Sequence, residues 1–313
     1  MPKTKLKTVT RPQQNNRALL SGAVELPDFE LDVEHIPVLV HGFRRMVREL
    51  SYDVCEMALT TYLCAREHGI AFTALPIFLV RDVHHDGIIY NTNSGLDGPR
   101  DLEGRNVAVN RGYTVTSGVW ARTTLKKYQG VDLSKVNWVP SGDEHVADYV
   151  APRNVSRHLL KNYGDEISSG RVVAGVGARI DHPSVAELLP NAFSNGLRAL
   201  KVDRYYPINH LVVIRNHVLE QSPDVAIQIF EAFSKSKSHY VKNLKEGRGG
   251  ETKRLDQIHK AALEVMSDPL PYGIEPNQSI LEELIENLVE QKILQNRVSL
   301  EDIFAEPVRN LVG

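Results

Sequence analysis

Three arginines stand where an α/β protein would bind a ligand carboxylate. Arg81 directly follows the apolar run FTALPIFLV, Arg179 follows the run RVVAGVGA, and Arg111 comes soon after NVAV. A guanidinium group pairs with a carboxylate through two parallel hydrogen bonds. Open α/β sheets bind ligands at the carboxyl ends of their strands. We therefore treat these arginines as candidate carboxylate-binding residues, the alternative for each being a surface arginine paired with a nearby acid.

Hydroxyl side chains begin two of the predicted helices. Thr116 and Ser117 stand at the start of one helix, and Thr60 and Thr61 stand at the start of another. Free N–H groups and the helix dipole make such an end favourable for a carboxylate. These hydroxyls are therefore candidate ligand donors, and helix capping alone is the alternative. Tyr113 could stack against an aromatic ligand.

Metal and nucleotide sites have little support in the sequence. His84, His85 and Asp86 are adjacent, but neighbouring residues on a strand point to opposite faces, so the two histidines do not easily share one ion. GRNVAVNRGYTVTSG is not the dinucleotide-binding fingerprint, and GVGAR lacks the following glycine and helix. Neither HExxH nor Gly-x-Ser-x-Gly occurs. We expect no metal and no organic cofactor.

The elements that must position these residues alternate between strands and helices. Short apolar runs predict strands, with amphipathic helices between them, at 29–33, 53–57, 72–80, 88–90, 107–109, 135–139, 172–176 and 210–215. This alternation of strands and helices indicates an α/β fold with a largely parallel sheet. Residues 157–162 are expected to be helical, and the last third of the chain is mostly helical. The basic run at 235–248 is typical of the solvated end of a long helix.

Several blocks of sequence resemble one known family. The blocks are DVCEMALTTYLCAREHG, LPIFLVRDVHHDGIIYN, DLEGRNVAV followed by TVTSGVWARTTL, YPINHLVVIR and DPLPYGIEPN. They lie in order between about residues 53 and 277, and together they resemble the 4,5-dihydroxyphthalate decarboxylase family. That family is itself similar to type II periplasmic solute-binding proteins.

The resemblance implies a two-lobed, type II periplasmic-binding-protein-like α/β fold (a Venus flytrap) with mixed sheets and a helical C-terminal part. Lobe one would contain residues 1–93 and 208–313, lobe two residues 94–207, and the ligand would lie in the cleft between them. The implied reaction releases one carboxylate of a hydroxylated benzene dicarboxylate as CO2, giving a protocatechuate-like product. The chain departs from the family at RPQQNN and in the longer loop around Arg111, which leaves the ring substitution open.

The implied decarboxylation needs a proton donor whose pKa lies near the working pH. The candidates are His85, His210 and Glu56. Glu56 lies in an otherwise apolar strand, where an acid is either paired or functional. His85 follows Arg81 by four residues, and His210 begins the strand HLVVIR. A structural role is the alternative for each, and the other histidines, His259 among them, belong to no recognisable constellation.

Composition limits the classes of partner. The 313 residues carry a net charge of -2, which offers no overall attraction for nucleic acid or an anionic membrane. Cys55 and Cys64 cannot form a disulfide framework and are expected to be buried thiols, which fits a reducing compartment. No apolar stretch predicts a secretory signal or a membrane span. We expect a cytoplasmic enzyme for a small aromatic carboxylate, with homo-oligomerisation left open.

Two other classes of function use the same predicted cleft. A solute-binding protein that feeds a transporter would keep the arginines but would need no proton donor near the ring. The absence of a signal favours the enzyme over this alternative. A cytoplasmic ligand sensor is the third reading, and it would need a partner surface that the sequence does not reveal.

Overall fold

The computed structural model describes residues 2–248 and 253–313, and the chain divides into two compact units. Unit 1 is formed by Met1–Asp82, Ile208–Glu283 and Val298–Gly313. Unit 2 is formed by Val83–Pro207 and Leu284–Arg297. Each unit is therefore assembled from segments that are distant in the sequence. The lobe boundaries expected from the family resemblance stay a prediction.

A five-stranded sheet forms the centre of unit 1, in the order β2-β1-β3-β10-β4. Its strands are β1 (Thr4–Val9), β2 (Phe29–Val33), β3 (Val54–Ala58), β4 (Phe72–Arg81) and β10 (Ile208–Arg215). The first three strands are parallel, whereas β10 runs antiparallel to both of its neighbours, β3 and β4. The sheet is therefore mixed, and a strand from the second half of the chain lies inside it, between β3 and the edge strand β4.

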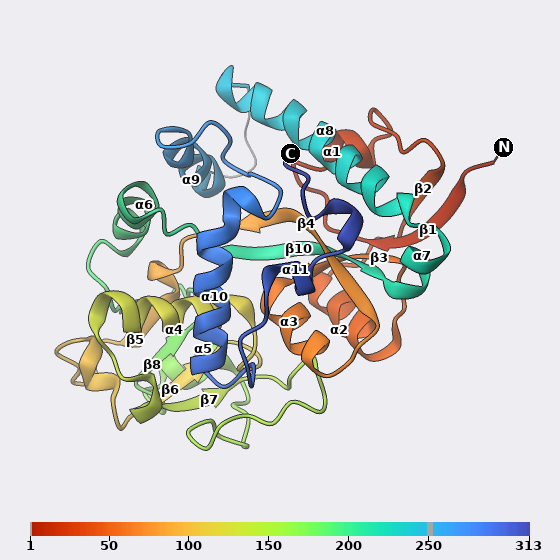
Figure 1. Cartoon of the computed structure of the whole chain (residues 1–313). Coiled ribbons are helices and arrows are strands. Elements are labelled where there is room, and N and C mark those ends of the chain that lie inside the picture. Colours follow the sequence, from red (N-terminus) through yellow and green to blue (C-terminus); the bar gives the residue numbers. More distant parts are fainter. Residues whose placement is uncertain (1, 249–252) are drawn as a thin grey trace. The chain divides into compact units, whose positions relative to one another are not determined.

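Helices pack on the sheet of unit 1. The helices α2 (Leu39–Glu49) and α3 (Leu59–Glu67) contact β3, and α8 (Asp224–Lys245) contacts β4. Figure 1 shows α8 on one side of the strands and α2 and α3 on the other. Phe43 and Met46 of α2 are buried, as the spacing of its apolar residues predicts. The other helices of this unit are α1 (Arg17–Leu20), α7 (Asn216–Gln221), α9 (Lys253–Leu263) and α11 (Leu300–Ile303), with the 3-10 turns η4 (Glu275–Asn277) and η5 (Glu306–Val308).

Unit 2 contains a second five-stranded mixed sheet, in the order β7-β6-β8-β5-β9. Its strands are β5 (Ile88–Asn91), β6 (Asn106–Val109), β7 (Asn137–Pro140), β8 (Ala174–Val176) and β9 (Val185–Glu187). Its helices are α4 (Thr116–Gln129), α5 (Tyr163–Ser168) and α6 (Ala192–Asp203), with the 3-10 turns η1 (His85–Gly87), η2 (Pro99–Leu102) and η3 (Leu133–Lys135). The boundary between the units falls within α10 (Gln278–Glu290).

Two local predictions are wrong. The residues expected to be helical, 157–162, are irregular, and α5 begins only at Tyr163. The side chain of Asn162 accepts hydrogen bonds from the N–H groups of Gly164 and Asp165, which fixes the start of the helix there. His84 does not lie on a strand either, because the chain turns through η1 immediately after it.

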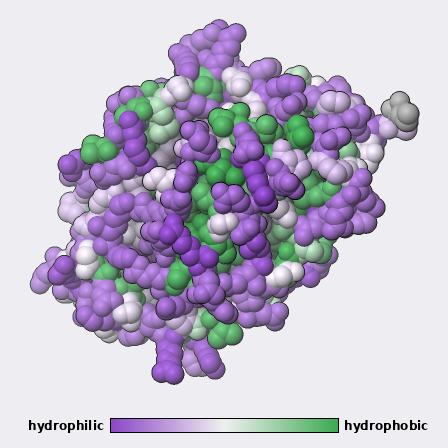
Figure 2. Space-filling model, viewed as in Figure 1, coloured by the Kyte–Doolittle hydropathy of each residue, from purple (hydrophilic) through white to green (hydrophobic). Residues whose placement is uncertain are grey.

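The visible surface is mostly hydrophilic. Figure 2 shows polar residues over most of this face, with smaller hydrophobic patches between them. Among the helices that the structure describes, none combines the length and the apolar character needed to cross a membrane.

Candidate active site

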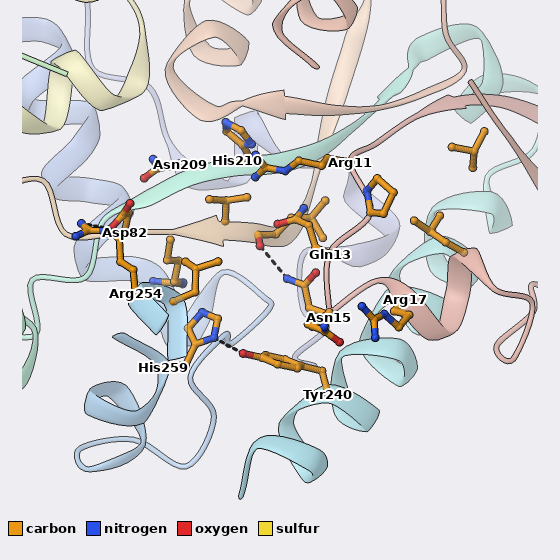
Figure 3. Close-up of a pocket in the computed structure, with 18 of the residues that line it drawn as sticks. Arg11, Gln13, Asn15, Arg17, Asp82, Asn209, His210, Tyr240, Arg254 and His259 are labelled. Carbon is orange, nitrogen blue, oxygen red and sulfur yellow. Dashed lines mark hydrogen bonds and ion pairs between the residues drawn. The ribbon is translucent and has the colours of Figure 1, made fainter. Parts of the chain in front are cut away.

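A cavity of about 910 Å³ opens within unit 1. It is bounded by the segment after β1, the end of β4, the start of β10 and the helices α8 and α9. Its polar lining, much of it labelled in Figure 3, includes Arg11, Gln13, Asn15, Arg17, Arg81, Asp82, Asn209, His210, Tyr240, Arg254 and His259. We call this space the unit 1 cavity.

Glu56 and His210, two of the predicted proton-transfer residues, are in direct contact. In the antiparallel pairing of β3 with β10, Glu56 lies opposite Val212 and His210 lies opposite Ala58. Side chains two residues apart on a strand share a face, so Glu56 and His210 are diagonal neighbours. The Glu56 Oε1 atom is 2.7 Å from His210 Nδ1, with the carboxylate fully buried and the imidazole 20% exposed. The sheet thus presents His210 to the cavity with Glu56 behind it.

The carboxylate of Glu56 is held by several further donors. The hydroxyl of Thr10 donates to Oε2 at 2.8 Å, the N–H of Arg11 at 2.9 Å, and the amide of Gln13 lies 3.4 Å from both oxygens. Burial by itself raises the pKa of Glu56, but the hydrogen bond and charge of His210, together with Arg11, outweigh burial and lower the pKa. An ionised Glu56 can accept a hydrogen bond from the Nδ1–H group of His210. A role for His210 as a proton donor to a ligand stays a prediction.

Arginines give the unit 1 cavity its positive character. Arg81 ends β4, is 2% exposed, and donates a hydrogen bond to the side-chain oxygen of Asn277. Arg254 of α9 forms an ion pair with Asp82 at 2.7 Å. Two further arginines line the cavity, Arg11 and Arg17. Arg81 is thus placed as the sequence predicts, at a strand end beside a cavity, and its role toward a carboxylate stays a prediction.

The same cavity contains a pair that the sequence did not single out. The hydroxyl of Tyr240 lies 2.5 Å from His259 Nδ1, and both side chains are 4% exposed. The prediction that 235–248 is a solvated helix end is wrong for Tyr240 and for Lys237, which is buried and pairs with Asp268. The apolar residues of α8 that recur along its buried face are the signal that could have shown this.

The two threonines of α3 lie inside unit 1 rather than on the cavity wall. Thr60 and Thr61 are 0% and 1% exposed, in the first turn of α3, and neither belongs to the lining of the cavity. The N-cap residue of this helix is Ala58, which makes no side-chain cap, so the hydroxyls do not serve as the N-cap. A role for them in ligand binding stays a prediction.

His85, the third proton-donor candidate, lines a smaller cavity of about 280 Å³ in unit 2. Its ring lies 5.4 Å from that of Tyr128, centroid to centroid. Burial, reinforced by His84 and opposed by Asp86, lowers the pKa of His85 to about 4. The imidazole is therefore neutral near pH 7, and its role as a proton donor stays a prediction.

The remaining predicted arginines also lie in unit 2. Arg179 is 49% exposed and forms an ion pair with Asp86 at 2.7 Å, which is the alternative that the sequence left open. Arg111 is exposed, adopts a left-handed backbone conformation with φ 66°, and donates its N–H to the hydroxyl of Ser141. Neither observation tests whether these side chains contact a ligand.

The turn before α4 already holds a carboxylate. Glu144 accepts hydrogen bonds from the N–H groups of Tyr113 and Thr114 and from the hydroxyl of Thr114. Thr116 is buried and Ser117 is half-buried in the first turn of the helix that follows. The N–H groups of this turn therefore bind a carboxylate of the chain itself, and a role for Thr116 and Ser117 toward a ligand stays a prediction.

Tyr113 is buried against a cation. Its ring centroid lies 3.9 Å from the guanidinium carbon of Arg122, and Arg122 donates to the Tyr113 carbonyl and to Gln291. Stacking of this ring on a ligand stays a prediction.

Within the described part of the chain, no group of three or more His, Cys, Asp and Glu side chains is arranged to hold a metal ion. Cys55 and Cys64 are buried and are not joined by a disulfide, as expected from the sequence.

Comparison with curated proteins confirms the resemblance stated from the sequence. The chain is 24% identical, over 91% of both chains, to a 4,5-dihydroxyphthalate decarboxylase of Comamonas testosteroni. It is 29% identical to a 4,5-dihydroxyphthalate decarboxylase of Pseudomonas putida, over 60% of this chain and 79% of the relative. No family model matches the chain.

Solved structures confirm the periplasmic-binding-protein-like fold. The alkanesulfonate-binding protein SsuA of Xanthomonas axonopodis pv. citri matches 98% of this chain and 97% of its own with a TM-score of 0.51 and 14% identity. The desulfurization enzyme DSZB matches 98% of both chains with a TM-score of 0.56 and 14% identity. At such identities the likeness concerns the fold, and this fold is found in a binding protein and in an enzyme alike.

Proposed function

We infer that this chain, a relative of the 4,5-dihydroxyphthalate decarboxylases, is a carboxy-lyase that removes one carboxylate from a hydroxylated phthalate. The observation that carries the proposal is the Glu56–His210 pair at the wall of a cavity lined by arginines. A benzene dicarboxylate requires cations to bind it and a proton donor to replace the departing carboxylate. The unit 1 cavity supplies both kinds of group.

Each group has a distinct part in the proposed reaction. Arg11, Arg17 and Arg81 provide the positive potential that attracts the two carboxylates into the unit 1 cavity. His210, protonated on both nitrogens, faces the ring, while the ionised carboxylate of Glu56 holds its Nδ1–H. Glu56 thereby orients the imidazole, as carboxylates do in other carboxylate–histidine pairs.

The chemical step that we propose is protonation followed by loss of CO2. A ring hydroxyl para to the leaving carboxylate donates electron density, and the ring carbon that bears the carboxylate takes the proton from His210 Nε2. A C–H bond forms, and the ring temporarily loses its aromaticity. The bond between the ring and the carboxylate then breaks, its electron pair restores the aromatic ring, and CO2 leaves. Solvent returns the proton to His210, so no oxidant or reductant is consumed.

Turnover of a defined panel of phthalates tests the proposed decarboxylase function. The purified protein, treated with a chelator, is incubated with 4,5-dihydroxyphthalate, 4-hydroxyphthalate and phthalate, and CO2 release and product are followed. We expect CO2 from a hydroxylated member of the panel without added cofactor. Turnover only after a divalent metal is added would contradict the metal-free reaction.

The outcome also separates the enzyme from the binding-protein alternative. Tight binding of a panel member with no turnover of any would contradict the decarboxylase and would favour a solute-binding role.

We further propose that the protein acts in the cytoplasm, where the thiols of Cys55 and Cys64 remain reduced. Cell fractionation with an antibody to the chain tests this location.

A further inference from the structure

Tyr240 and His259 form a second polar pair in the unit 1 cavity. Tyr240 comes from α8 and His259 from α9, and the two rings meet edge to face with centroids 5.6 Å apart. The phenol oxygen and the imidazole Nδ1 are 2.5 Å apart. Figure 3 shows this pair on the side of the cavity away from His210, with its hydrogen bond dashed.

The pair differs in charge from the arginines of the lining. Burial, with Arg81 acting in the same direction, lowers the pKa of His259 to about 4, although Asp256, Asp268 and Asp82 oppose the shift. Near neutral pH the imidazole of His259 is therefore uncharged. Whichever ring nitrogen holds the proton, the pair contains both a hydrogen-bond donor and an acceptor.

We propose that Tyr240, positioned by His259, recognises a ring hydroxyl of the substrate. The inference rests on the proposed function and names the group that selects a hydroxylated ring. A pair that offers both a donor and an acceptor matches a hydroxyl, which also donates and accepts, whereas a carboxylate is drawn to the arginines of the same cavity. The carboxylates and the hydroxyl of one ligand would thus be bound by different parts of the lining. His259 acts through Tyr240 and is a positioning residue.

Binding measured by calorimetry tests the assignment directly; every protein in this test, the one called wild-type included, also carries His210→Asn, so that the hydroxylated ligand is not decarboxylated during the titration. Wild-type protein should bind 4,5-dihydroxyphthalate at least ~10-fold more tightly than phthalate, because a buried polar site discriminates against a ligand that lacks its partner. In Tyr240→Phe and His259→Leu we expect this preference to fall to within about 3-fold, through weaker binding of the hydroxylated ligand alone. His259→Asn, which keeps a polar group near the position of Nδ1, should retain most of the preference.

A matched control removes a buried tyrosine hydroxyl elsewhere in unit 1. Tyr62 is fully buried, donates its hydroxyl to the carbonyl of Ile303 and does not line the cavity. Tyr62→Phe loses a hydrogen bond of the same kind and should keep the wild-type preference. Circular dichroism of each variant establishes that it is folded.

Two outcomes would overturn the assignment. One is a wild-type protein that binds phthalate as tightly as its dihydroxy derivative, a result that needs no variant of Tyr240 or His259 to fold. The other is a Tyr240→Phe variant that binds both ligands more weakly by the same factor. Neither outcome depends on turnover, so a protein that binds with the expected preference but releases no CO2 would contradict only the proposed function.

Discussion

Glu56 and His210 are 154 residues apart in the sequence, and the pairing of β3 with β10 brings them together. The sequence predicts each residue separately as a candidate proton donor, because Glu56 is an acid in an apolar strand and His210 lies at the start of another strand. Their contact could not be predicted, because it depends on an antiparallel register that local patterns do not encode. In this pair, Nδ1 of His210 is hydrogen-bonded to Glu56, and the imidazole lines the unit 1 cavity.

We predict that His210→Asn abolishes turnover but not binding. An asparagine amide can still donate to Glu56, so the buried carboxylate keeps a partner, but it cannot deliver a proton to the ring. We expect kcat to fall by at least ~100-fold, the usual contribution of a general acid. The Kd of the hydroxylated phthalate, measured by calorimetry, should change by no more than about 3-fold, the effect of losing at most one weak hydrogen bond.

The companion variant His85→Ala distinguishes the two histidines. Retained turnover in His210→Asn, together with lost turnover and intact binding in His85→Ala, would assign the proton to His85 in unit 2. That result would contradict the role proposed for the Glu56–His210 pair.

At the scale of elements, the segment between β1 and α1 contains RPQQNN, the stretch where the sequence is expected to depart from the family. RPQQNN, seen in the sequence as a loss of carboxylates, places Arg11, Gln13 and Asn15 on the cavity wall. Asn16, which is fully buried, accepts from the N–H of Gln13 and donates to the hydroxyl of Thr10 and the carbonyl of Arg11. The composition of this segment is visible in the sequence, but the sequence does not show that the segment lies beside Glu56.

We predict that Asn16→Ala loosens this segment. Loss of its hydrogen bonds inside unit 1 should lower the free energy of unfolding by roughly 1–3 kcal/mol. Because Arg11 and Gln13 then lose their fixed backbone, KM should rise more than kcat falls. Chemical denaturation and steady-state kinetics measure the two effects.

Asn154→Ala is the matched control for this variant. Asn154 lies in unit 2 and its amide donates to the carbonyls of Leu133 and Val136. Its loss should cost similar stability and leave KM unchanged. An equal rise of KM in both variants would show that stability alone, rather than the segment at 10–16, controls binding.

For the whole molecule, the family blocks and the strand–helix rhythm were sufficient to predict the α/β class and the periplasmic-binding-protein-like fold. The local rhythm alone suggested a largely parallel sheet, and the mixed sheets came from the family resemblance. The interior position of β10, between β3 and β4, is set by the topology of unit 1, and the burial of Tyr240 and His259 by the packing of α8 and α9. Such features arise from contacts between distant segments, so no single window of sequence reveals them.

We predict that acid destabilises the protein through one histidine in each unit. The pKa of His259 in unit 1 and of His85 in unit 2 is lowered from 6.5 to about 4, mainly by burial. Between these values the unfolded chain binds protons that the folded chain does not, so the free energy of unfolding falls as the pH drops from 6.5 toward 4. The loss should be on the order of 3 kcal/mol per histidine when the pH reaches the lower value.

Urea unfolding at several pH values measures this loss. His259→Asn and His85→Asn should each flatten the dependence between pH 6.5 and 4.5, because each removes one group that the unfolded chain protonates first. Variants whose stability falls in parallel with that of the wild type would show that other groups cause the acid sensitivity.

The two cysteines have a practical consequence. Cys55 lies on β3 and Cys64 on α3, both are fully buried, and burial together with Glu56 raises the pKa of Cys55 well above its usual value. The reactive thiolate is therefore suppressed in the native state. Since the chain has no other cysteine, an alkylating reagent records only the transient opening of unit 1 around β3 and α3, the elements that carry Cys55 and Cys64. The rate of alkylation of these thiols thus measures how often unit 1 opens. A ligand that slows alkylation would be shown to stabilise the native state around Cys55 and Cys64.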